Sequence, residues 1–262
     1  MAERHEGRPR LVVLQHVACE HLGTLEAPFR AACDVEVLQG WADPPAYRHA
    51  VDRLVKSRTY DAVVALGGPM AVYERDRVEF LEDSLRLLRA ALHRDVPVLG
   101  ICLGAQLLAW SLGAQVRPGR TLGLRKEIGW YPVTLTERGK VDPAFRGFRE
   151  NEPVFHWHGD TFALPEGTWH LARSALYPVQ AFRRGRWTYG VQFHVEVTRA
   201  LVAEWVEAYA GELATVEGVD GAALVEEAAR YEASLAAKAA VLAAHFVECA
   251  VESRRLQQAA GR

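Results

Sequence analysis

The sequence predicts an α/β fold: a three-layer sandwich on a central, mostly parallel sheet, with a helical extension at its C-terminal end. Short apolar runs alternate with helical segments through residues 11–113, which is typical of a parallel sheet covered on both faces. Half of the 262 residues are hydrophobic, enough to bury a large core. Beyond residue 211 the chain becomes rich in Ala and Glu. We therefore expect a first domain at 1–211 and a helical extension at 212–262.

Apolar runs in the first part of the chain predict buried strands, and the segments between them predict helices. The clearest helix is 78–93, where apolar residues recur every three or four positions and leave a polar face. We expect strands at 11–14, 35–38, 60–66 and 97–99, and further helices at 25–32, 47–56 and 106–112.

After Gly113 the pattern changes to short strands punctuated by Pro and Gly. Strands are expected at 128–136, 153–158 and 169–174, a hairpin at 179–182 and 187–193, and a helix at 199–210. The helix-forming composition of 222–256 predicts one bent helix or two. Its apolar stripe either folds back on the first domain or offers a docking surface to a partner. The stripe consists of Leu224, Val225, Tyr231, Leu235, Val241, Leu242 and Phe246.

Charge and cysteine usage narrow the class of protein. A net charge of −2 favours neither nucleic acid nor an anionic membrane as a partner. The polar first ten residues lack the apolar core of a signal peptide, and we expect no run long and apolar enough to span a bilayer. The four cysteines are scattered, with no CxxC pair and no metal-ligand spacing. These features predict a reduced, cytoplasmic enzyme without a metal or another cofactor.

One cysteine stands between two glycines at the end of the fourth predicted strand. The sequence there reads Gly100-Ile-Cys102-Leu-Gly104, and an apolar helix follows at once. The glycines permit the tight strand-to-helix turn of a nucleophile elbow, here with sulfur in place of oxygen. The free N–H groups and dipole of a helix start would lower the pKa of the thiol. The alternative is a buried structural cysteine in an ordinary strand–helix connection.

A histidine and a glutamate two residues apart form the second signal. In a strand, His194 and Glu196 would share one face while Val195 points away. By itself such a pair is more often structural than catalytic. Downstream of a cysteine elbow, it supplies the base and the orienting carboxylate that a thiol nucleophile requires. The acid follows the histidine here, whereas in α/β-hydrolases it precedes it.

With this order of Cys, His and Glu, the chain resembles the class I (triad-type) glutamine amidotransferases. It is most similar to stand-alone members related to the amidotransferase half of GMP synthetase. The resemblance extends over about residues 10–211 and rests on several motifs in the same order. The motifs are Leu66-Gly-Gly-Pro69, Gly100-Ile-Cys102-Leu-Gly104-x-Gln106, His158-Gly-Asp160, Ser174-x-x-Tyr-Pro178-Val-Gln-Ala-Phe182 and Phe193-His194-x-Glu196.

The resemblance implies a role for each motif residue. Cys102 would attack the γ-carbonyl of glutamine or of a γ-glutamyl compound, His194 would carry protons, and Glu196 would orient His194. The N–H groups of Gly68 and Leu103 would stabilise the oxyanion.

For the substrate's α-amino and α-carboxylate groups, the resemblance implies Gln106 and the backbone at Gly159 and Asp160. From its position alone, Gln106 could equally cap the helix after the elbow.

Two other polar pairs invite a functional interpretation. His156 and His158 could be metal ligands on one strand face, but no third ligand has suitable spacing, which favours an aromatic-lined structural role. His16 and Cys19 could form a second thiol site, but they lack an elbow, which favours packing.

Three functions remain open. The chain contains no Gly-x-x-x-x-Gly-Lys-[ST] phosphate loop, so the acceptor-activating half of a synthetase is missing. The favoured interpretation is a free-standing hydrolase of γ-glutamyl amides or peptides. An alternative is a glutaminase subunit that delivers ammonia to a separate synthase. A non-catalytic regulatory member of the family is the third, and the intact triad argues against it.

Overall fold

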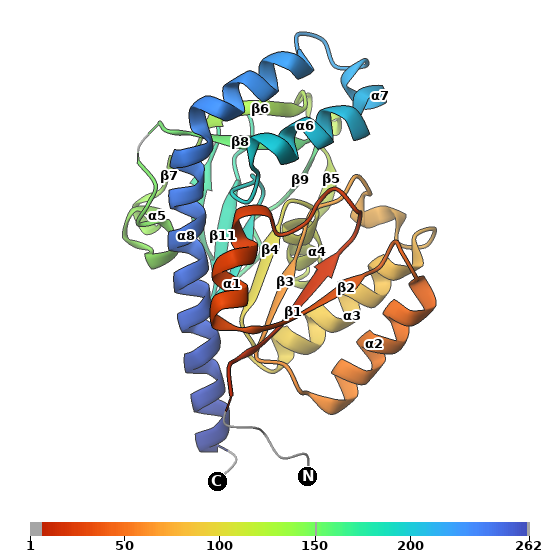
Figure 1. Ribbon diagram of the computed structural model, residues 1–262, viewed down its shortest axis with the longest axis vertical. Helices are drawn as coiled ribbons and strands as arrows, with labels where there is room; N and C mark the ends of the chain where they lie inside the picture. The colour runs from red at the N-terminus through yellow and green to blue at the C-terminus, as the bar shows by residue number, and fades with distance from the viewer. Residues whose placement is uncertain (1–6, 150, 261–262) are drawn as a thin grey trace.

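The computed structural model describes residues 7–149 and 151–260, and a single large sheet forms its centre (Figure 1). The strand order is β2-β1-β3-β4-β12-β11-β10-β7. The first five strands in this order are parallel, and the last three extend the sheet antiparallel. The predicted α/β fold with a mostly parallel sheet is confirmed. The strands are β1 (Arg10–Gln15), β2 (Asp34–Gln39), β3 (Ala62–Ala65), β4 (Val98–Ile101), β7 (Thr134–Leu135), β10 (Thr168–Arg173), β11 (Ala181–Arg184) and β12 (Thr188–Val191).

Helices cover both faces of this sheet. Alternate residues of β1 are accordingly buried in two different core clusters. Leu11 and Val13 belong to one core cluster, and Val12 and Leu14 belong to the other. The first cluster includes residues of α1 (Glu26–Ala32) and α8 (Gly221–Ala260). The second includes residues of α2 (Pro44–Ser57), α3 (Glu79–His93) and α4 (Leu103–Ser111). The remaining helices are α5 (Glu137–Val141), α6 (Arg199–Ala208) and α7 (Ala210–Leu213).

The predicted strand 128–136 is two strands in different sheets. The first, β6 (Glu127–Pro132), pairs with β8 (Pro153–His158), whereas β7 joins the main sheet through β10. Proline cannot donate a ladder hydrogen bond, so Pro132 is a natural end for β6. A third sheet pairs β5 (Val116–Pro118) with β9 (Asp160–Phe162). The predicted hairpin is confirmed: β11 and β12 are antiparallel neighbours.

The C-terminal extension is one helix of 40 residues, α8, drawn in blue along one side of the molecule in Figure 1. It contacts α1 and α6. Leu235, Leu242 and Phe246 are buried in the first core cluster. The apolar stripe therefore folds back on the domain. The predicted boundary at residue 211 lies within α7, and α8 shares a core with the residues before it.

The expectation about membrane spans needs correction. The segment Gly221–Ala259 is long and apolar enough to cross a bilayer by length and composition alone. The helix is rich in Ala, which raises the average hydropathy of the segment. Its large apolar side chains are spaced apart, so the sequence contains no long run of them. In its most apolar window, 44% is buried inside the molecule, and core helices of soluble proteins pass the same test. The segment is thus weak evidence for a membrane span.

Candidate active site

Cys102 occupies a sharp turn between β4 and α4. Its backbone has φ +50° and ψ −109°, a strained conformation for a residue with a side chain. The two flanking glycines are required by close backbone packing. A Cβ on Gly100 would lie 2.4 Å from the carbonyl oxygen of Gly104, and a Cβ on Gly104 would lie 1.9 Å from that of Ala65. The predicted elbow is present, and it brings the sulfur to the start of a helix.

His194 and Glu196 are in contact, although they do not lie in a regular strand. His194 Nδ1 and Glu196 Oε1 are 2.6 Å apart, and the Val195 N–H donates to Glu196 Oε2 at 2.9 Å. The prediction of a strand-borne pair is wrong because β12 ends at Val191. Its partner strand β4 ends at the elbow there, so no further residues of β4 are available to pair with the chain after Val191. The His194 N–H donates instead to the carbonyl of Phe155 in β8.

The electrostatics of the site are set by burial and by the carboxylate. Burial would lower the pKa of His194, but the Glu196 carboxylate and Cys102 raise it well above its usual value. Burial raises the pKa of the Cys102 thiol, and the positive charge of His194 opposes this effect. The direction is opposite to the predicted lowering of the Cys102 pKa, because removal of the sulfur from water is the largest effect on it. His194 Nε2 is buried without a hydrogen-bond partner among the described residues.

Two glutamines connect the sulfur to the helix after the elbow. Gln192 Nε2 lies 3.5 Å from Cys102 Sγ, and Gln106 Nε2 donates to Gln192 Oε1 at 3.2 Å. Gln106 is therefore not a cap of α4, because its amide points across to the strand side. Sequence reasoning did not single out Gln192. Its position between Val191 and Phe193, two residues before His194, is the signal that could have found it.

Gly68 and Leu103, whose N–H groups are the predicted oxyanion donors, are neighbours in space. Leu103 is the first residue of α4, so its N–H has no acceptor within the helix. Gly68 packs against it, because a Cβ on Gly68 would lie 3.0 Å from Leu103 Cδ2. His16 fixes the loop before Gly68, with Nδ1 3.0 Å from the Leu66 carbonyl and Nε2 3.2 Å from Ser84 Oγ.

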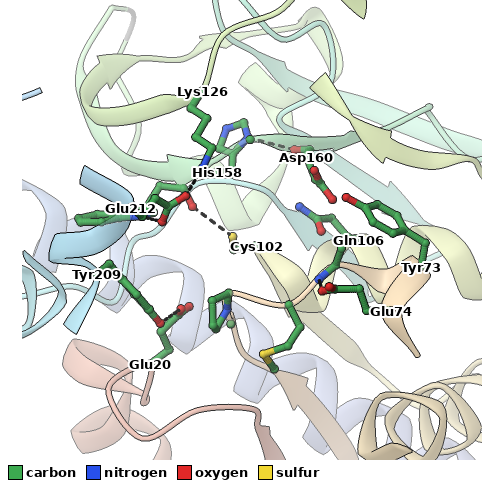
Figure 2. A pocket seen from close by; sticks show the side chains of 16 residues that line it. Glu20, Tyr73, Glu74, Cys102, Gln106, Lys126, His158, Asp160, Tyr209 and Glu212 are labelled. Atoms are coloured by element: carbon green, nitrogen blue, oxygen red, sulfur yellow. Dashed lines mark hydrogen bonds and ion pairs between the residues drawn. The ribbon is translucent and has the colours of Figure 1, made fainter. Parts of the chain in front are cut away.

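A cavity of about 230 Å³ opens over the sulfur (Figure 2). Five predicted site residues line it: Gly68, Cys102, Gln106, Gly159 and Asp160. The other predicted residues, Leu103, His194 and Glu196, are buried next to Cys102 or to each other. Sequence reasoning missed further lining residues, among them Glu20, Tyr73, Glu74, Lys126, Tyr209 and Glu212. These residues come from segments far apart in the chain, and no local spacing marks them.

Asp160 lies at the end of the cavity away from Glu20 in Figure 2, beside Tyr73. Burial raises the pKa of Asp160, and a hydrogen bond with Tyr73 opposes this effect. Burial, with Asp160 adding to it, raises the pKa of Tyr73 to about 12. This end of the cavity therefore presents a carboxyl group and a phenol to a polar ligand.

The histidine pair of β8 has a third polar neighbour that spacing did not reveal. Glu127 of β6 lies opposite His158, and Glu127 with both histidines could offer ligand atoms within 4.8 Å of one another. The expectation that no third ligand accompanies the pair is wrong, because strand pairing supplies one from a distant segment. Glu127 also accepts hydrogen bonds from Ser174 Oγ at 2.7 Å and from Gln180 Nε2 at 2.6 Å. This buried network explains the Ser174 to Phe182 motif as a support of the cavity wall.

His16 and Cys19 do not form a second thiol site. The Cys19 sulfur lies 3.4 Å from the Tyr209 hydroxyl, and His16 holds the loop at Leu66. Both residues are buried. The packing interpretation of this pair agrees with these contacts.

The fold and the site together define a thiol-dependent amidohydrolase. The chain belongs to the class I glutamine amidotransferases: the family model described as "Glutamine amidotransferase class-I" matches residues 31–202.

Among known proteins, the chain is 32% identical over 188 residues to the glutamine amidotransferase-like protein YfeJ of Salmonella typhimurium, covering 68% of this chain and 77% of that protein. It is 35% identical over 151 residues to a GMP synthase [glutamine-hydrolyzing] of Thermosipho melanesiensis. That match covers 57% of this chain but only 26% of the synthase. A crystal structure of a glutamine amidotransferase from Thermotoga maritima has a TM-score of 0.78 and 34% identity, with 93% of this chain and all of that chain covered.

Proposed function

We propose that this protein is a free-standing hydrolase that cleaves the γ-amide bond of glutamine or of another γ-glutamyl compound. The observation that carries the proposal is that one chain supplies the complete site. Cys102 lies on its elbow, and His194 contacts Glu196. Tyr209 and Glu212, which follow α6, complete the cavity wall. A site built in this way needs no partner to bring its groups together.

The first half of the reaction forms a thioester. Cys102 transfers its proton to His194, and the sulfur attacks the γ-carbonyl carbon. The N–H groups of Gly68 and Leu103 then stabilise the resulting oxyanion, a contribution worth about 10²–10³ in rate for one donor. The C–N bond breaks as His194 Nε2 gives the proton to the departing amine. The products of this half are the free amine and a γ-glutamyl thioester on Cys102.

The second half regenerates the thiol. His194 accepts a proton from water, the hydroxide oxygen attacks the thioester carbon, and the C–S bond breaks. The proton held by His194 returns to the sulfur, and glutamate leaves. Throughout both halves the Glu196 carboxylate keeps the ring orientation and stabilises the imidazolium.

The glutamyl end of the substrate would occupy the part of the cavity formed by Gln106, Gly159 and Asp160. The Asp160 carboxylate suits an α-ammonium group, and its ionisation is favoured when that cation binds. Gln106 and the backbone at Gly159 offer donors and acceptors for the α-carboxylate.

A second candidate is a glutaminase subunit that passes ammonia to a separate synthase. The names of the GMP synthase relatives favour it. The chain spans about a quarter of the length of those synthases, so their complete reaction is not carried over to it. Burial of Leu235, Leu242 and Phe246 weighs against this candidate, because these residues of the α8 stripe are already covered by the same chain.

The test is steady-state release of glutamate by the purified chain, without ATP, from glutamine, γ-glutamyl dipeptides and glutathione conjugates. We expect turnover of at least one of these substrates, with Cys102→Ala as the blank. Activity that appears only after a second protein and a nucleotide are added would favour the subunit.

A further inference from the structure

Glu20 is a buried acid at the edge of the cavity that the triad does not use. The residue is only 6% exposed, and its Oε1 accepts a 2.7 Å hydrogen bond from the Tyr209 hydroxyl. Its Oε2 has no hydrogen-bond or ion-pair partner among the described residues. Figure 2 shows the Glu20 carboxylate and Cys102 beside the same space. A carboxylate oxygen that has no partner among the described residues and belongs to a residue lining a cavity is available to a ligand group that enters the cavity.

This oxygen lies on the side of the site from which the amine departs. A Cβ placed on Gly67 would lie 1.9 Å from Glu20 Oε2 and 3.3 Å from His194 Cε1. The carboxylate and the imidazole therefore border the same small volume at Gly67. Cε1 lies between Nδ1, which contacts Glu196, and Nε2, which gives its proton to the leaving nitrogen in the proposed reaction. That nitrogen must come within about 3 Å of Nε2, which brings it next to Glu20.

The cavity around this point is rich in negative charge. Among the described residues, Lys126 is the only lysine that lines it, and it forms an ion pair with Glu212. Burial raises the pKa of Glu20 to about 7; His194 opposes this effect, and the nearby carboxylates add to it. A cation at this position would favour the ionised form of Glu20 and pair with it. The acids that line the cavity are Glu20, Glu74, Asp160 and Glu212.

Aromatic rings form the adjoining wall. Trp157 and Tyr209 both line the cavity, and their ring centroids are 5.6 Å apart. Aromatic faces attract ammonium groups and have no such attraction for carboxylates. Two rings beside a buried carboxylate make a combination that binds a positively charged nitrogen.

We infer that Glu20 selects the leaving group, and that the preferred substrates are γ-glutamyl amides of amines that carry a second, positively charged amino group. This inference rests on the proposed hydrolase function and names its substrate class. The Glu20 carboxylate pairs with the ammonium of the leaving amine, while Trp157 and Tyr209 enclose it. An amine that carries a carboxylate, as in an ordinary γ-glutamyl dipeptide, is repelled at the same position.

The test is a matched series of γ-glutamyl amides that differ in charge and not in length. The three amines are 1,2-diaminoethane, propylamine and 3-aminopropanoate, which make the second group cationic, neutral and anionic. We expect kcat/KM for the cationic amide to exceed that for the neutral one by about tenfold or more, the usual worth of a charged hydrogen bond. The anionic amide is expected to be the poorest substrate.

Glu20→Gln keeps the size of the side chain and removes its charge, so the ratio between cationic and neutral amides should fall toward one. Glu137→Gln, which alters an exposed carboxylate of α5, is the matched control and should keep the wild-type ratio. Equal kcat/KM of the wild type for all three amides would overturn the inference but would not contradict the proposed hydrolase function. A preference that survives in Glu20→Gln would also overturn it.

Two measurements that do not use Glu20→Gln remain decisive if that variant fails to fold. Free 1,2-diaminoethane should inhibit glutamate release more strongly than propylamine. If the isolated chain cleaves none of the amides, the proposed function fails, and calorimetric binding of the three amides to Cys102→Ala then tests the inference alone. Equal affinity for the three amides would overturn it.

Discussion

His194 Nδ1 and Glu196 Oε1 are 2.6 Å apart, with both side chains buried. The carboxylate stabilises the positive charge of the ring and, with Cys102, overcomes the effect of burial on the His194 pKa. This pairing suits His194 Nε2 to the proton transfers of the proposed reaction. Its position is fixed from two sides, because the Val195 N–H donates to Glu196 Oε2 and the His194 N–H donates to Phe155.

Glu196→Gln should lower kcat by roughly 10²- to 10⁴-fold, because a neutral amide still contacts Nδ1 but no longer stabilises an imidazolium. The same change removes a group that raises the His194 pKa, so that pKa falls. The ascending limb of the kcat/KM profile, which requires neutral His194, should then move to lower pH. Wild-type kcat in this variant, or a limb that stays in place, would contradict the role of Glu196. His194→Ala is the reference for complete loss.

Cys102 should be the first cysteine alkylated by limiting iodoacetamide at pH 7. All four cysteines are buried, but only Cys102 lines the cavity and lies beside His194, which can accept its proton. Burial raises the pKa of Cys33 to about 11 and that of Cys249 to about 12, so these thiols resist reaction. Peptide mapping by mass spectrometry gives the order. Earlier labelling of another cysteine, with activity retained, would exclude Cys102 as the nucleophile.

Gly104→Ala should destabilise the protein by about 2 kcal/mol or more, because the new Cβ would meet the Ala65 carbonyl oxygen at 1.9 Å and force the elbow away from β3. Gly211→Ala is the matched control, since nothing lies within 4 Å of a Cβ there. It should be neutral or slightly stabilising within α7, given that Ala exceeds Gly in helix propensity by up to about 1 kcal/mol. Urea denaturation gives both values, and similar ones would contradict the packing argument.

Acid should destabilise the fold through His16. Burial lowers the pKa of His16 from 6.5 to about 4. Below pH 6.5 the unfolded chain therefore binds a proton at His16 that the folded chain does not bind. The free energy of unfolding decreases as the pH is lowered from 6.5 to about 4. The full contribution of this residue is about 3 kcal/mol. His16→Gln should lose less stability than wild type between pH 7 and pH 4 in urea titrations. Parallel curves for the two proteins would show that His16 is not the acid-sensitive group.

The sequence predicted those features of the site that are local in the chain. Glycines on both sides of Cys102 predict a tight turn. Gly104 can approach Ala65 as closely as it does only because it has no Cβ. A continuous apolar run such as 11–14 predicts a strand with both faces buried, and β1 contributes to both cores.

Groups supplied by strand pairing or by distant loops could not be predicted in this way. Glu127 meets His158 only because β6 pairs with β8, and Glu20 meets Tyr209 across 189 positions. The pKa of Cys102 was predicted in the wrong direction for the same reason. Its burial depends on the whole tertiary structure, whereas the helix start that follows it is visible in the sequence.

The cavity wall formed by Tyr209 and Glu212 has an evolutionary consequence. These residues, like Glu20, lie outside the matched residues 31–202, whereas Cys102, His194 and Glu196 lie within them. Selection for a new leaving amine can therefore act on the segments at 16–23 and 209–213 while the bond-breaking groups stay as they are. Of the residues that we propose to contact the leaving amine, Glu20 and Tyr209 thus lie outside the stretch that contains the reacting groups, whereas Trp157 lies within it.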